Sequence, residues 1–429
     1  MRAIGVLEAA SRVSEASEVL ELDISTDSAR LTPGGGLVRS SGSESSTTVR
    51  IIRNGRIGVA SVSGGGGPPE LMDKAISVSR VGPAASIAFP GPSEPGTLDI
   101  SHPLVASAGL EDLTALLVGI EEELASRWPS STVRGAVSRR TTEVSLANSS
   151  GFRGSYSKSV LEVALVFTFA GPDGLTVRNC RFVTGLPLTD PARIIEGLMP
   201  CPQGTRKVSP PDRSVPAVLS PRVLSTLLQS LRSQAAGWTR DGGFSTLQPG
   251  MEIASTVFTL HDRPRLPFGG ASAPFDGEGV PTSDRCLVDG GRFAGHIHDL
   301  SSASACGAAT TGSAGRNPGE LPVPVCTNLS LEPGGKTFGE LLAEAGRGVL
   351  VSELLPGGYG STSEGDFRIP LAAAFAVSSG QVAAPVGAGC FLAGNASEIL
   401  GRIVAVEDTL YGVESDRLPH VLVDGLAFS

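Results

Sequence analysis

Apolar residues recur at helical spacing in a few segments of the chain and alternate with polar residues in many others. The strongest helical pattern lies in residues 111–128, where apolar side chains from Leu113 to Leu124 fall on one helical face. Weaker patterns predict further helices at residues 4–22, 70–79 and 191–199.

Alternating segments predict antiparallel strands joined by short turns. The clearest hairpin joins residues 47–53 to residues 56–61 through Asn54-Gly55, a dipeptide that supplies the two positive φ angles of a type I′ turn. A three-stranded meander is predicted after it, with strands at residues 141–147, 159–170 and 175–183.

A proline-rich stretch, residues 202–211, is the best candidate for a domain boundary. A predicted strand at residues 217–219 then leads into a helix, which Ser220 would cap while Pro221 takes its first position. Strand and turn patterns dominate the rest, interrupted by helices predicted at residues 337–346 and 395–407.

These patterns predict an α+β fold with two domains. In the first, residues 1–208, N-terminal helices would pack on an antiparallel sheet. The second, residues 209–429, would be a β-rich, barrel-like body that carries the helix after Ser220.

Charge and composition exclude several classes of protein. The 429 residues carry a formal net charge of −9 and their basic residues are scattered, unlike those of a nucleic-acid-binding protein. Every long apolar stretch is interrupted by Pro, Gly or charge, so no membrane span is predicted. The six cysteines form no CxxC pair, and the first residues do not resemble a signal peptide. We expect a cytoplasmic protein with no nucleic-acid or membrane partner.

Familiar catalytic motifs are missing or incomplete. Residues 330–337 approach a phosphate-binding loop, but Ser330 replaces its first glycine and Pro333 removes a backbone donor. Thr337 and Glu340 predict a helix-capping box there instead. The sequence also lacks the GxSxG and HExxH motifs.

Two polar segments remain as candidate binding sites. His296 and His298 would lie on one face of a strand and could form half of a metal site, but two partly exposed strand histidines explain the pattern more simply, because no further ligand is evident. The turn Glu364-Gly365-Asp366 places a glycine between two acids, so it either lines a ligand groove or forms a solvated turn.

Asp276 and Glu278 form a third candidate, in a glycine-rich turn. Their carboxylates are either catalytic or, more simply, caps of the turn, because nothing nearby in the sequence supplies a catalytic partner.

Several segments of the second half follow one another in a familiar order. Residues 275–282 read FDGEGVPT and residues 311–316 read TGSAGR. Together with the predicted hairpin at 287–299 and the segments 324–333 and 341–353, they resemble the motifs of the TldD/PmbA family of zinc metallopeptidases. In the first half, the hairpin around Asn54-Gly55 and the turn at residues 148–151 resemble the family more weakly.

The resemblance implies one of the two kinds of subunit in this family. A TldD subunit carries HExxxH on the helix after the boundary strand and a cysteine ligand near its C-terminus, whereas a PmbA (TldE) subunit lacks the zinc site and pairs with TldD. The corresponding helix here, residues 223–232, holds neither His nor Glu. The chain therefore resembles the PmbA (TldE) kind, and Cys390 is expected to be a buried thiol.

A heterodimer follows from this resemblance, with an HExxxH-bearing partner that supplies zinc and the general base. This chain would hold no cofactor and no catalytic or metal-binding residue. It would help to enclose a chamber and hold an extended peptide by strand addition, with His296, His298, Glu364, Gly365 and Asp366 as its lining. Such a pair would serve peptide turnover, peptide processing or natural-product biosynthesis.

An alternative is a stand-alone or homodimeric module that binds a peptide or small molecule, or hydrolyses it without metal. Its acids would be Asp276, Glu278 and Asp366. A neighbouring gene that encodes an HExxxH homologue would favour the heterodimer over this alternative.

Overall fold

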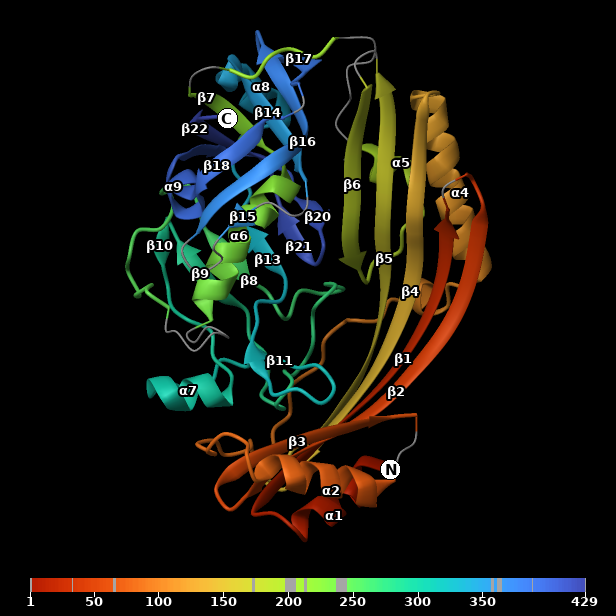
Figure 1. Cartoon of the computed structure of the whole chain (residues 1–429), viewed down its shortest axis with the longest axis vertical. Helices are drawn as coiled ribbons and strands as arrows, with labels where there is room; N and C mark the ends of the chain where they lie inside the picture. Colours follow the sequence, from red (N-terminus) through yellow and green to blue (C-terminus); the bar gives the residue numbers. More distant parts are fainter. Residues whose placement is uncertain are drawn as a thin grey trace.

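The structure, a computed structural model, describes most of the chain. The described residues are 2–32, 34–64, 67–171, 174–196, 206–211, 214–236, 245–355, 359–360, 365–387 and 389–428. They form two α+β parts that lie side by side, and this confirms the predicted fold class (Figure 1). The boundary between residues 208 and 209 stays a prediction.

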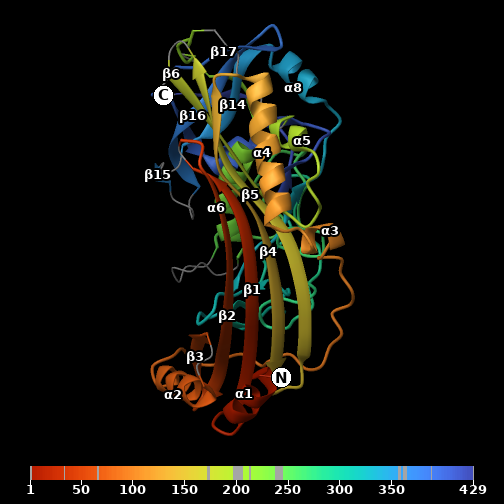
Figure 2. The same ribbon diagram turned by 90° about the vertical axis from the view of Figure 1, so that its right-hand side faces the viewer.

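Six antiparallel strands form the sheet of the N-terminal part, in the order β3-β2-β1-β4-β5-β6. Figures 1 and 2 show that the long strands bend, so that the sheet forms half of a barrel. The strands are β1 (Ala16–Leu31), β2 (Leu37–Arg53), β3 (Arg56–Ser63), β4 (Ser131–Asn148), β5 (Arg153–Gly171) and β6 (Gly174–Thr184).

The predicted hairpin and meander are confirmed. Asn54 and Gly55 adopt φ angles of 51° and 66°, as the tight turn between β2 and β3 requires. The meander strands β4, β5 and β6 occur where they were predicted, and each extends beyond its alternating segment.

Five helices accompany this sheet. In Figure 1, α1 and α2 cover its lower end, and α4 lies against its upper end. Helices α2 and α4 confirm the predictions for residues 70–79 and 111–128. The helices are α1 (Arg2–Ser11), α2 (Pro68–Ser79), α3 (Pro103–Ala106), α4 (Leu110–Arg127) and α5 (Pro191–Glu196).

The helix predicted over residues 4–22 is wrong beyond Ser11, because β1 begins at Ala16. Val19 packs with the apolar faces of α1 and α2, whereas Leu20 packs on the other face of the sheet, in a cluster with Phe275. Since both faces are covered here, adjacent apolar residues are both buried, and the strand loses the alternation that would have identified it.

Two sheets form most of the C-terminal part. The larger has eight strands, ordered β15-β16-β14-β7-β22-β19 with β17 and β18 paired to β16. Its strands are β7 (Val215–Leu219), β14 (Arg347–Leu354), β15 (Tyr359–Gly360), β16 (Asp366–Ser378), β17 (Gln381–Pro385), β18 (Phe391–Asn395), β19 (Ile403–Val406) and β22 (Val421–Leu426).

The second sheet has six short strands, in the order β10-β9-β8-β13-β21-β20. They are β8 (Leu260–Asp262), β9 (Arg285–Asp289), β10 (Arg292–Phe293), β13 (Leu329–Leu331), β20 (Tyr411–Val413) and β21 (Asp416–Leu418). A further pair consists of β11 (Ala314–Gly315) and β12 (Val323–Pro324).

The helices of the C-terminal part are α6 (Pro221–Ala235), α7 (Leu300–Cys306), α8 (Phe338–Ala345) and α9 (Ala396–Gly401). The helix predicted over residues 395–407 is wrong after Gly401, because the following residues form β19 and pair with β22. Helix α7 was not predicted. Within the described ranges, no helix combines the length and apolarity needed to cross a bilayer.

The alternation along β7 places a helix on each face of the larger sheet. Ala217 and Leu219 pack into the core around α6, whereas Val218 packs with α8 on the opposite face. The α6 core also contains residues of the second sheet, such as Leu260 and Leu331. Helix α6 is therefore enclosed between two sheets.

A buried ion cluster joins the N-terminal sheet to the C-terminal part. Arg50 of β2 donates to Glu18 of β1 at 3.2 Å and to Glu278 of the C-terminal part at 2.7 Å, and all three side chains are inaccessible to solvent. Glu278 also accepts the backbone N–H of Leu300, and Arg316 binds Glu18. The cluster thus fixes where the two parts meet.

Replacing Arg50 by Met should lower the free energy of unfolding by about 3–5 kcal/mol, because Glu278 would be left buried without its cation. Urea denaturation followed by circular dichroism measures this change. The matched control is Arg140→Met, which breaks a partly exposed pair with Glu162 and should cost about 1 kcal/mol or less. Adding Glu278→Gln to Arg50→Met should restore part of the loss. Equal effects of Arg50→Met and Arg140→Met would contradict this account.

Candidate functional site around helix α6

Helix α6 starts where the sequence predicts it. Ser220 caps it, since its hydroxyl accepts the N–H of Val223 at 3.3 Å, and Pro221 occupies the first helical position. The Ser220 hydroxyl also donates to the Ser352 carbonyl of β14 at 2.8 Å. The capped end is thereby fastened to the larger sheet.

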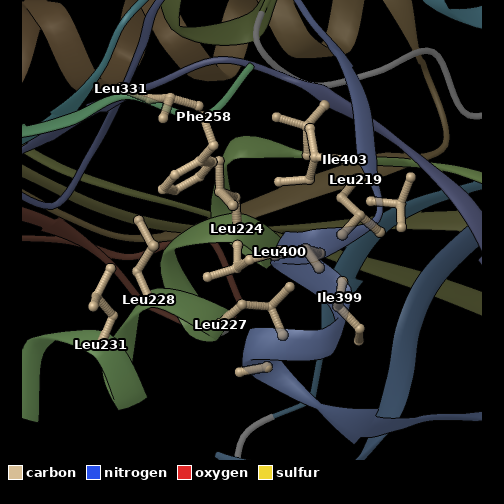
Figure 3. Close-up of a cluster of buried hydrophobic side chains, with 14 of the residues drawn as sticks. Leu219, Leu224, Leu227, Leu228, Leu231, Phe258, Leu331, Ile399, Leu400 and Ile403 are labelled. Atoms are coloured by element: carbon tan, nitrogen blue, oxygen red, sulfur yellow. The ribbon is translucent and has the colours of Figure 1, made fainter. Parts of the chain in front are cut away.

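Leucine side chains of α6 form the centre of the C-terminal core. Figure 3 shows Leu224, Leu227, Leu228 and Leu231 directed toward a set of apolar side chains contributed by both sheets and α9. The neighbouring side chains labelled in Figure 3 are Leu219, Phe258, Leu331, Ile399, Leu400 and Ile403. This helix is thus a structural element of the core along most of its length.

The donor set on α6 does not fit a zinc ion. The polar side chains buried on this helix are serines and Gln234, and the helix has no His, Cys, Asp or Glu. Across the described ranges, no group of three or more His, Cys, Asp and Glu side chains is placed to hold a metal ion. Cys390 is a buried free thiol, as predicted, with its Sγ 3.2 Å from the carbonyl oxygen of Gly387.

The segment from His296 to Asp299 follows β10 and lies against the C-terminal end of α6. The N–H of Ile297 donates to the carbonyl of Ala235 at 2.9 Å. The imidazole rings of His296 and His298 have centroids 6.2 Å apart, so the two predicted histidines are neighbours. Burial lowers the pKa of both imidazoles below the ordinary value, so they are neutral at neutral pH.

The two histidines differ in their partners. His298 is buried and its Nδ1 lies 3.3 Å from the hydroxyl of Ser302, in helix α7, which Asp299 caps. In contrast, Nε2 of His296 is a buried ring nitrogen that the described residues leave without a hydrogen bond.

Gly365 and Asp366 lie at the start of β16, against the same half of α6. A Cβ placed on Gly365, whose φ is +81°, would lie 3.2 Å from the hydroxyl of Ser230. Asp366 is exposed and accepts a hydrogen bond from Asn395 at 2.9 Å. Glu364, the third predicted residue of this turn, lies outside the described residues.

Two of the predicted segments therefore meet the same end of one helix. Its polar side chains there are Ser230 and Gln234, which are buried and joined by a hydrogen bond of 3.1 Å. The segments of His296 and Asp366 reach this end through their neighbours Ile297 and Gly365. This arrangement can present hydrogen-bonding groups to a ligand, but it contains no nucleophile activated by a base.

Asp276 and Glu278 have structural partners. The Asp276 carboxylate accepts backbone N–H groups of Glu278, Val280 and Ala314, so it caps its turn as the simpler interpretation proposes. Burial raises its pKa to about 6. Glu278 has the partner that the sequence did not supply, namely Arg50, 228 positions earlier in the chain.

The residues that complete these groups were not predicted from the sequence. Ser230 and Gln234 gave no signal, since isolated polar residues on an apolar helix are ordinary. Arg50 did give one, because it stands between Val49 and the apolar pair Ile51-Ile52. An arginine at such a position predicts a buried carboxylate partner.

Comparison with known proteins identifies relatives of the whole chain and of its C-terminal half. Residues 212–429 match the family described as PmbA/TldA metallopeptidase C-terminal domain. The chain is 28% identical over 204 residues to a protein named metalloprotease TldD homolog from Haemophilus influenzae, covering 46% of this chain and 42% of that protein. It is 29% identical over 219 residues to the metalloprotease PmbA homolog of the same organism, covering 51% and 46% respectively.

These two matches each span less than half of the relative's length. A protein named metalloprotease from Methanothermobacter thermautotrophicus matches over 382 residues at 26% identity, covering 85% of this chain and 82% of the relative. Among solved structures, TldE from Thermococcus kodakarensis has a TM-score of 0.87 at 20% identity and covers 99% of both chains. The likeness to this structure shows that the two proteins share their fold.

Gly365→Ala should lower the free energy of unfolding by about 1–2 kcal/mol, because Gly365 has a positive φ and the added Cβ would crowd Ser230. Thermal and urea unfolding measure the change. Gly339→Ala in helix α8 is the matched control, since a Cβ there meets nothing within 4 Å, and it should be neutral or stabilising. A neutral Gly365→Ala would contradict the close approach of β16 to α6.

Proposed function

Because this chain belongs to the PmbA/TldD family of metallopeptidases, we propose that it is the non-zinc subunit of a heterodimeric peptidase of that family. Hydrolysis is performed by a TldD-like partner that carries HExxxH and the zinc ion. This chain encloses part of the chamber and holds an extended peptide, or a peptide-like substrate, while the partner cleaves it.

The observation that carries the proposal is the apolar character of α6. A catalytic zinc site needs three protein ligands and an open position for water, and the corresponding helix here directs leucines into a closed core. A peptidase of this family that has such a helix requires its metal from another chain.

The free edge of β2 supports a role for a partner. Residues 46–53 of β2 pair with β3, whereas residues 37–45 pair only with β1 among the described strands. The side chains of residues 37–44 are exposed, and Leu37 and Val38 are apolar. An exposed strand edge pairs readily with a strand of another chain, so we assign this edge to the partner subunit.

The substrate surface in this proposal is the polar group at the C-terminal end of α6. Its described residues are His296, His298, Gly365 and Asp366; Glu364, which was also predicted to contact the substrate, lies outside the described residues. A peptide bound there as an added strand is recognised mainly through its backbone. This mode suits varied peptides, and we propose roles in peptide processing or natural-product biosynthesis.

We further propose that the complex works in the cytoplasm. The five cysteines within the described ranges are all free thiols, as is usual in a reducing compartment. The alternative of a non-metal hydrolase is disfavoured, because Asp276 and Glu278 are committed to backbone N–H groups and to Arg50.

Zinc content and solution mass test the heterodimer. We expect the chain purified alone to be free of stoichiometric zinc and inactive on peptides. Co-expression with an HExxxH-bearing homologue should give a zinc-loaded pair that cleaves peptides, measured by elemental analysis, light scattering and peptide digestion. A lone chain that holds stoichiometric zinc or cleaves peptides would overturn the proposal, and His296, His298 and Cys390 would then be the ligands to substitute.

Val38→Lys should weaken assembly with the partner by about tenfold or more, because it places a charge on the free edge of β2. Titration of the labelled partner measures the dissociation constant. Val81→Lys is the matched control, since Val81 is 85% exposed and is not part of this edge. Unchanged assembly of Val38→Lys, with normal unfolding of both variants, would exclude the edge as the interface.

A further inference from the structure

A cavity lies at the N-terminal end of α6, opposite to the end that carries Ser230 and Gln234. It has a volume of about 310 Å³ and is formed by β6 of the N-terminal sheet, the first residues of α6, and β20 and β21. In Figure 1, β6 is the sheet strand that faces β20 and β21. At about 1.5 Å per residue along the helix, this cavity is more than about 10 Å from Ser230.

Arginines gather around this cavity in a chain whose net charge is negative. Arg178 and Arg181 come from β6, Arg222 from the first turn of α6, and Arg417 from β21. No aspartate or glutamate lines the cavity among the described residues. A cavity with four arginine residues and no acidic residue in its described lining favours an anion.

Two of these arginines have carboxylate partners. Glu353 pairs with Arg222 at 3.0 Å, and Glu162 lies 3.6 Å from Arg181. Within the described ranges, no carboxylate lies at ion-pair distance from Arg417, whose Nη1 donates to the backbone carbonyl of Asp416 at 3.1 Å. Burial lowers the pKa of Arg417, and the neighbouring Asp416 carboxylate offsets this only in part.

The rest of the lining combines apolar walls with an unused hydroxyl. Leu186, Leu188 and Ile194 form part of the wall. Ser352 lines the cavity, and its fully buried hydroxyl has no hydrogen-bond partner among the described residues. A ligand with a polar end and an apolar body would satisfy both features.

We propose that this cavity binds a hydrophobic carboxylate, whose carboxyl group contacts Arg417 and Arg181 and whose apolar body lies against Leu186, Leu188 and Ile194. Arginine suits this ligand because its planar guanidinium can bind a carboxylate with two parallel hydrogen bonds. The carboxylate belongs to a free organic acid or to the C-terminus of a peptide. This proposal does not depend on the proposed role as the non-zinc subunit of a peptidase, because the cavity lies at the other end of α6 from the proposed substrate surface.

Calorimetric titration of the full chain with N-acetyl-leucine and with N-acetyl-leucinamide tests the site. The two probes differ only in the carboxylate, so the acid should bind at least about tenfold more tightly, as expected for a charge-assisted hydrogen bond. Arg417→Gln and Arg181→Gln should each weaken binding of the acid by about tenfold. Arg181 is 57% exposed, so its substitution leaves the fold intact even if Arg417→Gln does not.

Arg292→Gln is the matched control, because Arg292 is an exposed arginine of β10 that does not line the cavity. The affinity of this variant for N-acetyl-leucine should equal that of the unsubstituted chain. A leucine-terminated tripeptide, with a free or an amidated C-terminus, identifies the source of the carboxylate. Tighter binding of the free peptide than of N-acetyl-leucine assigns the site to peptide C-termini, and the reverse order assigns it to free acids. The proposal would be overturned if N-acetyl-leucine and N-acetyl-leucinamide bound equally well, or if neither N-acetyl-leucine nor the free tripeptide bound. It would also be overturned if Arg181→Gln bound N-acetyl-leucine as tightly as the unsubstituted chain does.

Discussion

The enclosure of α6 between two sheets is the constraint on which the rest of the structure depends. A helix covered on several sides must present apolar side chains in most directions, and α6 does so with its leucines. Burial of the four leucines labelled on α6 is worth roughly 1.5–3 kcal/mol each. Such a helix cannot also hold a hydrated metal ion, whose ligands require polar partners of their own. In this chain, stability and metal chemistry therefore exclude each other at α6.

The polar side chains that could bind a ligand lie near the two ends of this helix. At its C-terminal end, Ser230 and Gln234 meet the segments of His296 and Asp366. At its N-terminal end, the capped first turn contributes Arg222 to a cavity with basic lining. The same apolar core separates the two regions, so a ligand at one end has no direct contact with a ligand at the other.

The buried cluster of Arg50, Glu18 and Glu278 has a different role from the core. Removing three charges from water is costly, and the cost is offset only because each ion finds a partner. The pair joins Glu278 of the C-terminal part to Arg50 of the sheet, so it favours the docking in which these two residues meet. This cluster positions the half-barrel, and with it the free edge of β2.

Turn-forming and helix-capping residues determined those elements that depend only on a few neighbouring residues in the sequence. Asn54-Gly55 fixed a hairpin, Ser220-Pro221 fixed the start of α6, and Thr337 with Glu340 fixed the start of α8. Each depends on backbone dihedral angles or on hydrogen bonds across one turn, so no distant residue is needed. The motifs of the second half likewise indicated the family, because they are short and local.

The tertiary structure decided what depends on distant partners. Residues 16–22 became a strand because they pair with β2 and β4, and residues 403–406 became a strand because β22 lies beside them. Glu278 became half of an ion pair because folding brought Arg50 to it, and β6 met α6 to form a cavity only through the docking of the two parts. Burial and pairing across long separations in sequence have no local signature, so the sequence by itself determined the turns, caps and family motifs, whereas the tertiary structure decided the buried charges and the cavity.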